Sequence, residues 1–345
     1  MTLIRHGQGE NPLVGFQVDR RSIQYVGNEL QRPECILAER DGTLWAADAR
    51  GGVVRIGPGG EQELITQSVD SHFDLVGDAA NSLLEGTLPN GLAFDREGNI
   101  LISNFGTDRL EIMTRSGETR MLADSLDGVP LGKVNFVLRD SKNRIWITIS
   151  TMVNPWSDAI TPGISDGYIC LLDEKGLRIV ADGFAFTNEI RLDANEEWLY
   201  VAETTGKRVC RLRVAADGSL SDRQVYGPDN LGTGVIDGLA FDSFGNLWAT
   251  MIFADRLIAI TPKGDVLELL DDGAPEATDQ FEAEFQGTGP VSIATMLNCG
   301  GTVAPWMASV TFGGADLRTV YIGSLRGDRL PCFRSPVARL PMVHW

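Results

Sequence analysis

Short apolar runs separated by polar turns recur along the chain. In residues 89–104, the apolar run Gly91-Leu-Ala-Phe94 is followed by a turn that ends at Gly98 and by a second apolar run, Ile100-Leu-Ile102. Runs of this kind, broken by Asp-Gly or Glu-Gly, are typical of β-hairpins. The same pattern occurs in five further segments, 33–48, 133–148, 187–202, 236–250 and 309–324. The sequence has no long stretch with a 3.6-residue apolar period, which excludes a helical solenoid.

Each hairpin is followed by sequence that has room for two more strands. Further apolar runs occupy residues 53–56, 109–113, 167–172, 208–214 and 256–261. A unit of four antiparallel strands that repeats about every 40 to 50 residues is typical of a β-propeller blade. The sequence therefore predicts an all-β fold, a six-bladed β-propeller with four antiparallel strands per blade.

Aligning the repeats on their turns reveals a polar residue at the same place in each one. Glu34 stands eight positions before the turn residue Gly42, and Asp237 stands eight positions before Gly245. The complete set is Glu34, Asn90, Asn135, Asn188, Asp237 and Ser309. Equivalent positions of successive blades surround one central channel, so these side chains should converge there. Two carboxylates with several carboxamides suit Ca²⁺, Mg²⁺ or Mn²⁺. The alternative is that they solvate the channel or make turn hydrogen bonds.

Composition and charge narrow the classes of partner. The 345 residues carry a formal net charge of −17, which disfavours nucleic acid and anionic membranes as partners. The sequence contains neither an apolar run of about 20 residues nor a signal peptide, so a cytoplasmic location is expected. The five cysteines are scattered and form no CxxC pair, which predicts reduced, buried thiols rather than disulfides or a zinc site.

The repeats also define the expected domain boundaries. Residues 1–30 form an N-terminal arm, 31–326 the propeller and 327–345 an apolar, proline-rich tail. The last blade should carry an insertion at about 266–308, because 72 residues separate Asp237 from Ser309. The arm either runs along the outside or supplies a closing strand for the last blade. The chain is expected to be a monomer or a homodimer.

Several motifs together resemble a known family of six-bladed propellers. They are Pro33-Glu34, Thr187-Asn188, Ile236-Asp237-Gly-Leu239, Gly245-Asn-Leu-Trp248 and Phe312-Gly-Gly-Ala-Asp316. The chain, over roughly residues 30 to 326, is similar to the family that contains regucalcin (senescence marker protein) and the gluconolactonases, and more distantly diisopropyl fluorophosphatase and paraoxonase. The resemblance implies one catalytic divalent ion in the channel, Ca²⁺ first and Zn²⁺, Mn²⁺ or Mg²⁺ otherwise.

By position in the motifs, the resemblance assigns the metal ligands to Glu34, Asn188 and Asp237. Asn135 matches a family residue that contacts the metal, its water or the substrate, and Asn90 would add a further contact to the substrate or the metal site. The relatives that open sugar lactones carry an arginine two residues before the third-blade asparagine and an aspartate after it. Here those places hold Lys133 and Phe136.

These departures bear on the substrate. Phe136 suggests a more apolar substrate than a sugar acid lactone, and Lys133 would bind a carboxylate or carbonyl group unless it is simply exposed. Other aromatic residues could form the rim of the site or ordinary core, and they are Trp156, Phe184, Phe186 and Trp306.

The predicted function is hydrolysis of a small-molecule lactone by a metal-activated water in the central channel. None of the three histidines, His6, His72 and His344, falls at a repeat-phased position, so no histidine base is expected. Asp237 is then either the catalytic acid–base group or a metal ligand only. The alternatives are another metal-assisted reaction at the same site, phosphotriester hydrolysis or isomerisation, and a binding propeller with a structural Ca²⁺.

Overall fold

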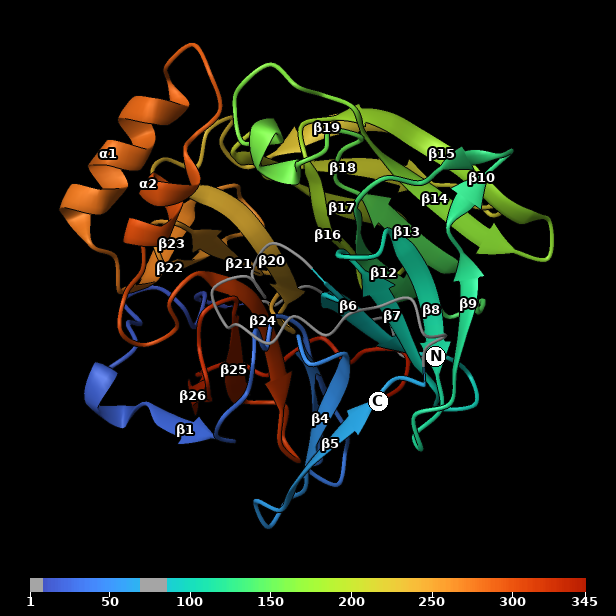
Figure 1. Cartoon of the computed structure of the whole chain (residues 1–345). Coiled ribbons are helices and arrows are strands. Elements are labelled where there is room, and N and C mark those ends of the chain that lie inside the picture. The colour runs from blue at the N-terminus through green and yellow to red at the C-terminus, as the bar shows by residue number, and fades with distance from the viewer. Residues whose placement is uncertain (1–8, 69–85) are drawn as a thin grey trace.

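The expected hairpins are present, and each extends into a four-stranded antiparallel sheet. A computed structural model describes residues 9–68 and 86–345, and within these residues six such sheets surround a central channel as blades (Figure 1). The innermost strands are β2 (Ile36–Ala38), β6 (Pro89–Phe94), β12 (Val134–Arg139), β16 (Thr187–Leu192), β20 (Val235–Phe241) and β24 (Met307–Gly313). Each innermost strand contacts the next, and β24 contacts β2, so the ring is closed.

The remaining strands complete the blades outward from the channel. Blade one adds β3 (Leu44–Asp48), β4 (Gly52–Ile56) and β5 (Gln62–Thr66). Blade two adds β7 (Ile100–Asn104), β8 (Arg109–Met113) and β9 (Thr119–Ala123). Blade three adds β13 (Ile145–Ile149), β14 (Gly167–Asp173) and β15 (Gly176–Phe184). Blade four adds β17 (Trp198–Glu203), β18 (Arg208–Val214) and β19 (Leu220–Tyr226). Blade five adds β21 (Leu247–Ile252), β22 (Arg256–Ile260) and β23 (Val266–Asp271). A small hairpin, β10 (Ser125–Leu126) with β11 (Val129–Pro130), lies between blades two and three.

The turns used to align the repeats have the backbone that this alignment requires. Gly42, Gly98 and Gly245 have φ of 93°, 84° and 102°, and Asn143, the equivalent residue of the third blade, has φ of 61°. Glycine and asparagine are the residues that most readily adopt this left-handed conformation. The alignment is therefore confirmed for these four blades, and the polar residues eight positions earlier occupy equivalent places in the ring.

The last blade is closed by a strand from the N-terminal part of the chain. It contains β25 (Thr319–Ser324), β26 (Leu330–Arg334) and, at its outer edge, β1 (Gln24–Val26). Strand β1 pairs antiparallel with β26, with Gln24 opposite Cys332. Of the two roles open to the arm, the structure shows the closing strand.

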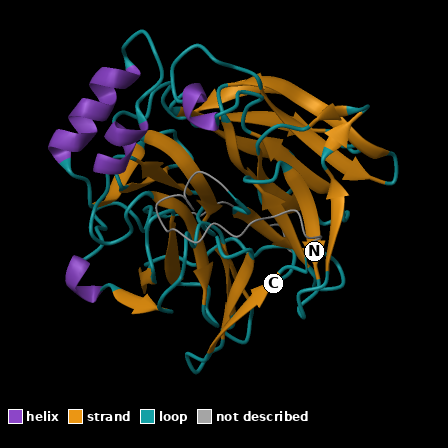
Figure 2. Ribbon diagram, viewed as in Figure 1, coloured by secondary structure: helices purple, strands orange, loops and turns teal. Residues whose placement is uncertain are grey.

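Some boundaries differ from the expected ones. Residues 266–271 form β23, the outer strand of the fifth blade, rather than the start of an insertion. The insertion follows β23 and contains α1 (Pro275–Phe285) and α2 (Ile293–Asn298), which gather at one side of the ring (Figure 2). Strand β26 lies beyond residue 326, so the propeller extends into the region expected to be tail.

The C-terminal tail crosses the ring on the side of the hairpin turns. The main-chain nitrogen of Leu340 donates to the oxygen of Phe241 in blade five (3.0 Å). The Nε2 atom of His344 lies 3.1 Å from the oxygen of Ala38 in blade one. All five cysteines are free and buried, as predicted. In the described ranges, no helix is both long and apolar enough to span a bilayer.

Candidate active site

Five of the six repeat-phased polar residues lie at bulges in the innermost strands, and Glu34, which precedes the regular pairing of β2, is the exception. The pairing register shifts between Pro89 and Leu92 in blade two, and between Ile236 and Leu239 in blade five. Asn90 and Asp237 stand inside these irregularities. A β-bulge turns a side chain away from the regular alternation of a strand. The equivalent shifts in blades three, four and six lie at Val134/Phe136, Thr187/Ile190 and Met307/Val310.

Hydroxyl groups from the second strands brace these bulges. The Oγ1 atom of Thr250 accepts a hydrogen bond from the nitrogen of Gly238 (2.8 Å) and donates to the oxygen of Ala308 in the next blade (2.6 Å). Ser103 makes the equivalent pair of contacts between Gly91 and Asn135. A Cβ atom at position 238 would lie 2.4 Å from the oxygen of Ala308, so only glycine fits there without movement.

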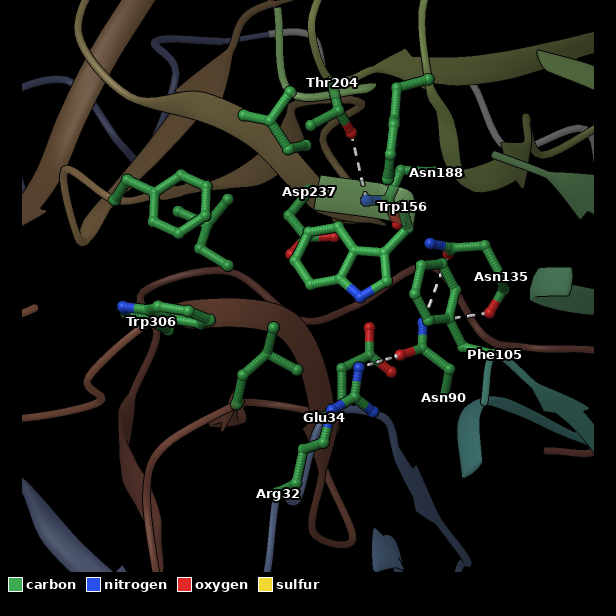
Figure 3. A pocket seen from close by; sticks show the side chains of 15 residues that line it. Arg32, Glu34, Asn90, Phe105, Asn135, Trp156, Asn188, Thr204, Asp237 and Trp306 are labelled. Atoms are coloured by element: carbon green, nitrogen blue, oxygen red, sulfur yellow. Dashed lines mark hydrogen bonds between the residues drawn. The ribbon is translucent and has the colours of Figure 1, made fainter. Parts of the chain in front are cut away.

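Five of the six polar residues lie around one pocket. Glu34, Asn90, Asn135, Asn188 and Asp237 all line it (Figure 3). Ser309 is the exception, because its hydroxyl donates to the main-chain oxygen of Glu34. The sequence-predicted convergence on the channel therefore holds for the five side chains proposed as ligands or substrate contacts.

Two of these side chains carry oxygens with no hydrogen-bond partner. Glu34 is 1% exposed, and both of its carboxylate oxygens lack a donor. The Oδ1 atom of Asn188 also lacks one, while its Nδ2 atom donates to Thr204 Oγ1 (3.1 Å). Buried oxygens without donors are rare, and they point to an ion or water that binds them. The amide oxygen of Asn135, in contrast, already accepts from Asn90 Nδ2 (3.3 Å).

The electrostatics of the pocket have the same implication. Burial, together with the negative charges of Asp237 and Glu189, raises the pKa of Glu34 well above its usual range. Burial and the charge of Glu189 likewise raise the pKa of Asp237, although Arg32 opposes the shift. A cation held between these carboxylates would stabilise both in the ionised form. Within residues 9–68 and 86–345, no group of three or more His, Cys, Asp or Glu side chains is placed to hold a metal ion. A cation bound by Glu34 and Asp237 would therefore need an amide oxygen as a further ligand.

Sequence reasoning missed one charged residue of the pocket, Arg32. It is 7% exposed, and its Nη2 atom donates to Asn90 Oδ1 (2.8 Å). The signal was present, because Arg32 stands two residues before Glu34, the same offset that separates Lys133 from Asn135.

Aromatic and aliphatic side chains form the remaining wall of the pocket. They are Phe105, Trp156, Ile160, Phe186, Ile252, Phe253, Trp306 and Leu325. Of the four aromatic residues considered as rim, Trp156, Phe186 and Trp306 are in this wall, whereas Phe184 is buried beneath the guanidinium of Arg223. The empty space at the pocket is ≈ 530 Å³, part of which is open to solvent.

The insertion packs on the outside of this wall. Phe253 stacks on Phe281 of α1, with ring centroids 4.7 Å apart. Lys207 Nζ lies 2.5 Å from Glu282 Oε2, and Glu282 Oε1 accepts from the nitrogen of Gly234 (2.8 Å). These contacts tie α1 to blades four and five beside the pocket.

Two residues expected to contact the substrate are not among those that line the pocket. Lys133 forms an ion pair with Asp108 (3.0 Å). Phe136 is buried in the core, and its ring lies 4.5 Å from the guanidinium of Arg191. It does not line the pocket, whereas Lys133, whose Nζ lies 5.7 Å from the ring centroid of Phe105 in the pocket wall, stays a predicted substrate contact. His6 and His72 lie outside the described residues, and His344 lies in the tail.

Comparisons with known proteins agree with this architecture. The model of the family described as SMP-30/Gluconolactonase/LRE-like region matches residues 65–279. A 6-deoxy-6-sulfogluconolactonase from Pseudomonas putida is 26% identical over 157 residues, which are 45% of this chain and 44% of that protein. The match thus spans less than half the length of this relative.

Solved structures show the same fold at low sequence identity. A gluconolactonase from Xanthomonas campestris has a TM-score of 0.64 and 17% identity, over 92% of this chain and 89% of its own. A calcium-binding protein, regucalcin, from Agrobacterium tumefaciens has a TM-score of 0.63 and 13% identity, over 90% of this chain and 93% of its own.

Proposed function

Because the chain belongs to the SMP-30/gluconolactonase/LRE-like family, we propose that it is a metal-dependent hydrolase that opens a lactone in the central pocket. The observation that carries the proposal is the buried carboxylate of Glu34, whose two oxygens lack donors beside the equally unpartnered Asn188 Oδ1. The names of the relatives from Pseudomonas putida and Xanthomonas campestris support lactone chemistry.

The proposed cation ligands are Glu34, Asn188 and Asp237. Their donor set fits a hard divalent ion, and the calcium-binding relative favours Ca²⁺. Such an ion supplies Lewis-acid polarisation of the lactone carbonyl and lowers the pKa of water. Asn135 is better suited to the substrate than to the ion, since its oxygen already accepts from Asn90.

The protein's own groups then have distinct tasks. The oxygen of the attacking water bonds to the lactone carbonyl carbon, and Asp237 accepts the proton that this water loses. When the ring carbon–oxygen bond breaks, Asp237 returns that proton to the leaving alkoxide, and the product is a hydroxy acid. The amide nitrogen of Asn135 donates to a substrate oxygen, and the aromatic wall excludes bulk water.

The test is turnover of a lactone panel, from aldonolactones to apolar γ- and δ-lactones, by chelator-stripped protein with and without Ca²⁺, Mn²⁺, Zn²⁺ or Mg²⁺. We expect metal to restore turnover and Asp237→Ala to lower kcat by about 100-fold or more. The matched control is Asp316→Ala, which removes an exposed carboxylate paired with Arg334 and should change nothing. Tight binding of one ion per chain without turnover of any lactone would favour a structural ion instead.

A further inference from the structure

Arg32 is held in an unusual backbone conformation at the entrance of blade one. Its φ is 55°, a left-handed value that is unfavourable for a residue with a side chain. Phe186, two residues before Asn188, has φ of 56° and stands at the same place in blade four. Blades one and four are opposite each other in the six-membered ring, so a cation and an aromatic ring face the channel from opposite sides.

The guanidinium of Arg32 is buried without a carboxylate among its hydrogen-bond partners. Nη2 donates to Asn90 Oδ1 (2.8 Å) and Nη1 to the main-chain oxygen of Pro89 (3.3 Å), both neutral acceptors. The Nε atom is buried with no partner. Of the three other buried arginines that the structure describes, two are paired with a carboxylate, Arg144 with Asp140 and Arg191 with Glu189, each at 2.6 Å. The third, Arg339, donates to Thr311 Oγ1 (2.8 Å) and, unlike Arg32, does not line the pocket. A desolvated guanidinium usually binds an anion that accepts from it in a bidentate manner.

The buried charges along the channel also indicate that the site needs an anionic ligand. Among the described residues, three buried acids and three buried arginines lie here, and they are Glu34, Glu189, Asp237, Arg32, Arg191 and Arg339. They interact electrostatically with one another, and their formal charges sum to zero. A divalent cation bound at the carboxylates therefore leaves the channel with a surplus of positive charge. An uncompensated buried charge is costly, so the complete site requires a negative ligand.

We infer that the substrate is an acidic lactone, one that carries a carboxylate or sulfonate substituent, and that Arg32 binds this anionic group. The inference rests on the proposed function. Of the three channel arginines, Arg32 alone lines the pocket, which Glu34 and Asp237 also line. The aromatic wall contacts the lactone ring, and Arg32 sets the specificity for charge.

The test uses two γ-lactones of the same size that differ by one charge, 5-oxotetrahydrofuran-2-carboxylate and its primary amide. Metal-loaded wild-type protein should have a higher kcat/KM for the carboxylate. In Arg32→Gln, kcat/KM for the carboxylate should fall about 30-fold, the effect of losing charge-assisted hydrogen bonds, while the value for the amide changes less than about threefold. Arg32→Lys should keep part of the preference, since the charge remains. Arg334→Gln removes an equal charge at the exposed pair with Asp316 and should leave both values unchanged.

Two binding measurements do not depend on turnover. The ring-opened product, 2-hydroxyglutarate, should bind metal-loaded wild-type protein in calorimetry and lose about 30-fold in affinity in Arg32→Gln. Ca²⁺ alone should bind Arg32→Gln more tightly, by roughly threefold or more, because a positive charge near Glu34 and Asp237 is gone. Circular dichroism and thermal unfolding establish that each variant is folded.

The outcomes separate the two proposals. If wild-type protein opens neither lactone with any metal, the proposed function fails, and the binding of 2-hydroxyglutarate to wild type and Arg32→Gln still decides the role of Arg32. If wild type opens both lactones but Arg32→Gln lowers both alike, lactone hydrolysis stands and the inference is overturned. The inference about Arg32 would also be overturned if Lys133→Gln lost the preference for the carboxylate over the amide while Arg32→Gln kept that preference.

Discussion

The ring of Phe253 stacks on the ring of Phe281 at 4.7 Å, with an angle of 29° between their planes. Phe253 belongs to the wall of the pocket, and Phe281 belongs to α1 of the insertion. Phe281 is fully buried and also stacks on Phe285. The insertion is therefore part of the structure that shapes the pocket, although none of its helical residues lines the pocket directly.

Replacing Phe281 by Ala should destabilise the protein and loosen the pocket together. Removing a buried phenylalanine ring costs about 3–5 kcal/mol of the free energy of unfolding, measured by urea titration. KM for the lactone should rise, because Phe253 loses the surface against which it packs. Met121→Ala, at a half-exposed position of β9, should change the free energy of unfolding by less than about 0.5 kcal/mol. An unchanged KM in a clearly destabilised Phe281→Ala would show that the insertion does not shape the site.

The five thiols should be unreactive in the native protein. All are buried, and burial raises the pKa of Cys170 and of Cys299 to about 12. A thiol with such a pKa is almost entirely protonated at neutral pH and is a poor nucleophile. We expect Ellman's reagent to label no cysteine in buffer and five in guanidinium chloride. Rapid labelling of Cys332 in buffer would instead show that β26 separates from the closing strand β1.

The ring and the polar centre could be predicted from the sequence because both follow from a repeated spacing. A turn residue with positive φ fixes each hairpin, and the residue eight positions earlier then falls at the same place in each blade. That logic led to Glu34 and Asp237 without further information. Burial of the cysteines was predicted separately, from their scattered positions without a CxxC pair.

The substrate contacts were harder to predict because bulges change which way a side chain points. The register shift lies at Asn135, whose side chain lines the pocket, while the next residue, Phe136, packs in the core. Arg32 was missed for a different reason. Its equivalent in blade three is the basic Lys133, but those in blades two and five are the apolar Leu88 and Val235, so only part of the repeat marks this position as charged. Strand β23 was missed because the long interval between Asp237 and Ser309 was interpreted as an insertion from residue 266 on, although four of residues 266–271 are apolar.

Calcium should stabilise the wild-type protein through Glu34. At a Ca²⁺ concentration 100 times its Kd, ligand binding adds about 2.7 kcal/mol to the free energy of unfolding. Glu34→Gln should gain less than about 1 kcal/mol from Ca²⁺, and in chelator it should be at least as stable as wild type, because it removes a buried carboxylate that has no donor.

The matched control for this measurement is Glu39→Gln in the same blade. Glu39 accepts from Trp45 Nε1 (2.7 Å) and pairs with Arg115 (2.8 Å) on the outer side. This variant should lose some stability in both conditions while keeping the full gain from Ca²⁺. If Glu34→Gln also keeps the full gain, Glu34 does not bind the ion.

Docking of the tail should depend on pH through His344. Burial lowers the pKa of His344 to about 4, with Arg339 and Arg139 contributing in the same direction and the Ala38 carbonyl and Glu39 opposing them. Between pH 6.5 and pH 4 the unfolded chain binds more protons at this residue than the folded chain does. The stabilisation from His344 is therefore complete above about pH 6.5 and decreases as the pH falls.

The expected loss on acidification is about 1–2 kcal/mol, since the ring is only partly buried. The measurement is urea unfolding at pH 7.0, 5.5 and 4.5 for wild type and for His344→Phe. Phenylalanine keeps the edge-to-face contact with Phe94, whose centroid lies 5.1 Å away, but has no proton to bind. Carboxylates titrate alike in both proteins, so the difference between the two curves isolates the histidine. A difference that stays constant from pH 7.0 to 4.5 would mean that His344 is equally protonated in the folded and unfolded chains, and that the tail is not held by a neutral imidazole.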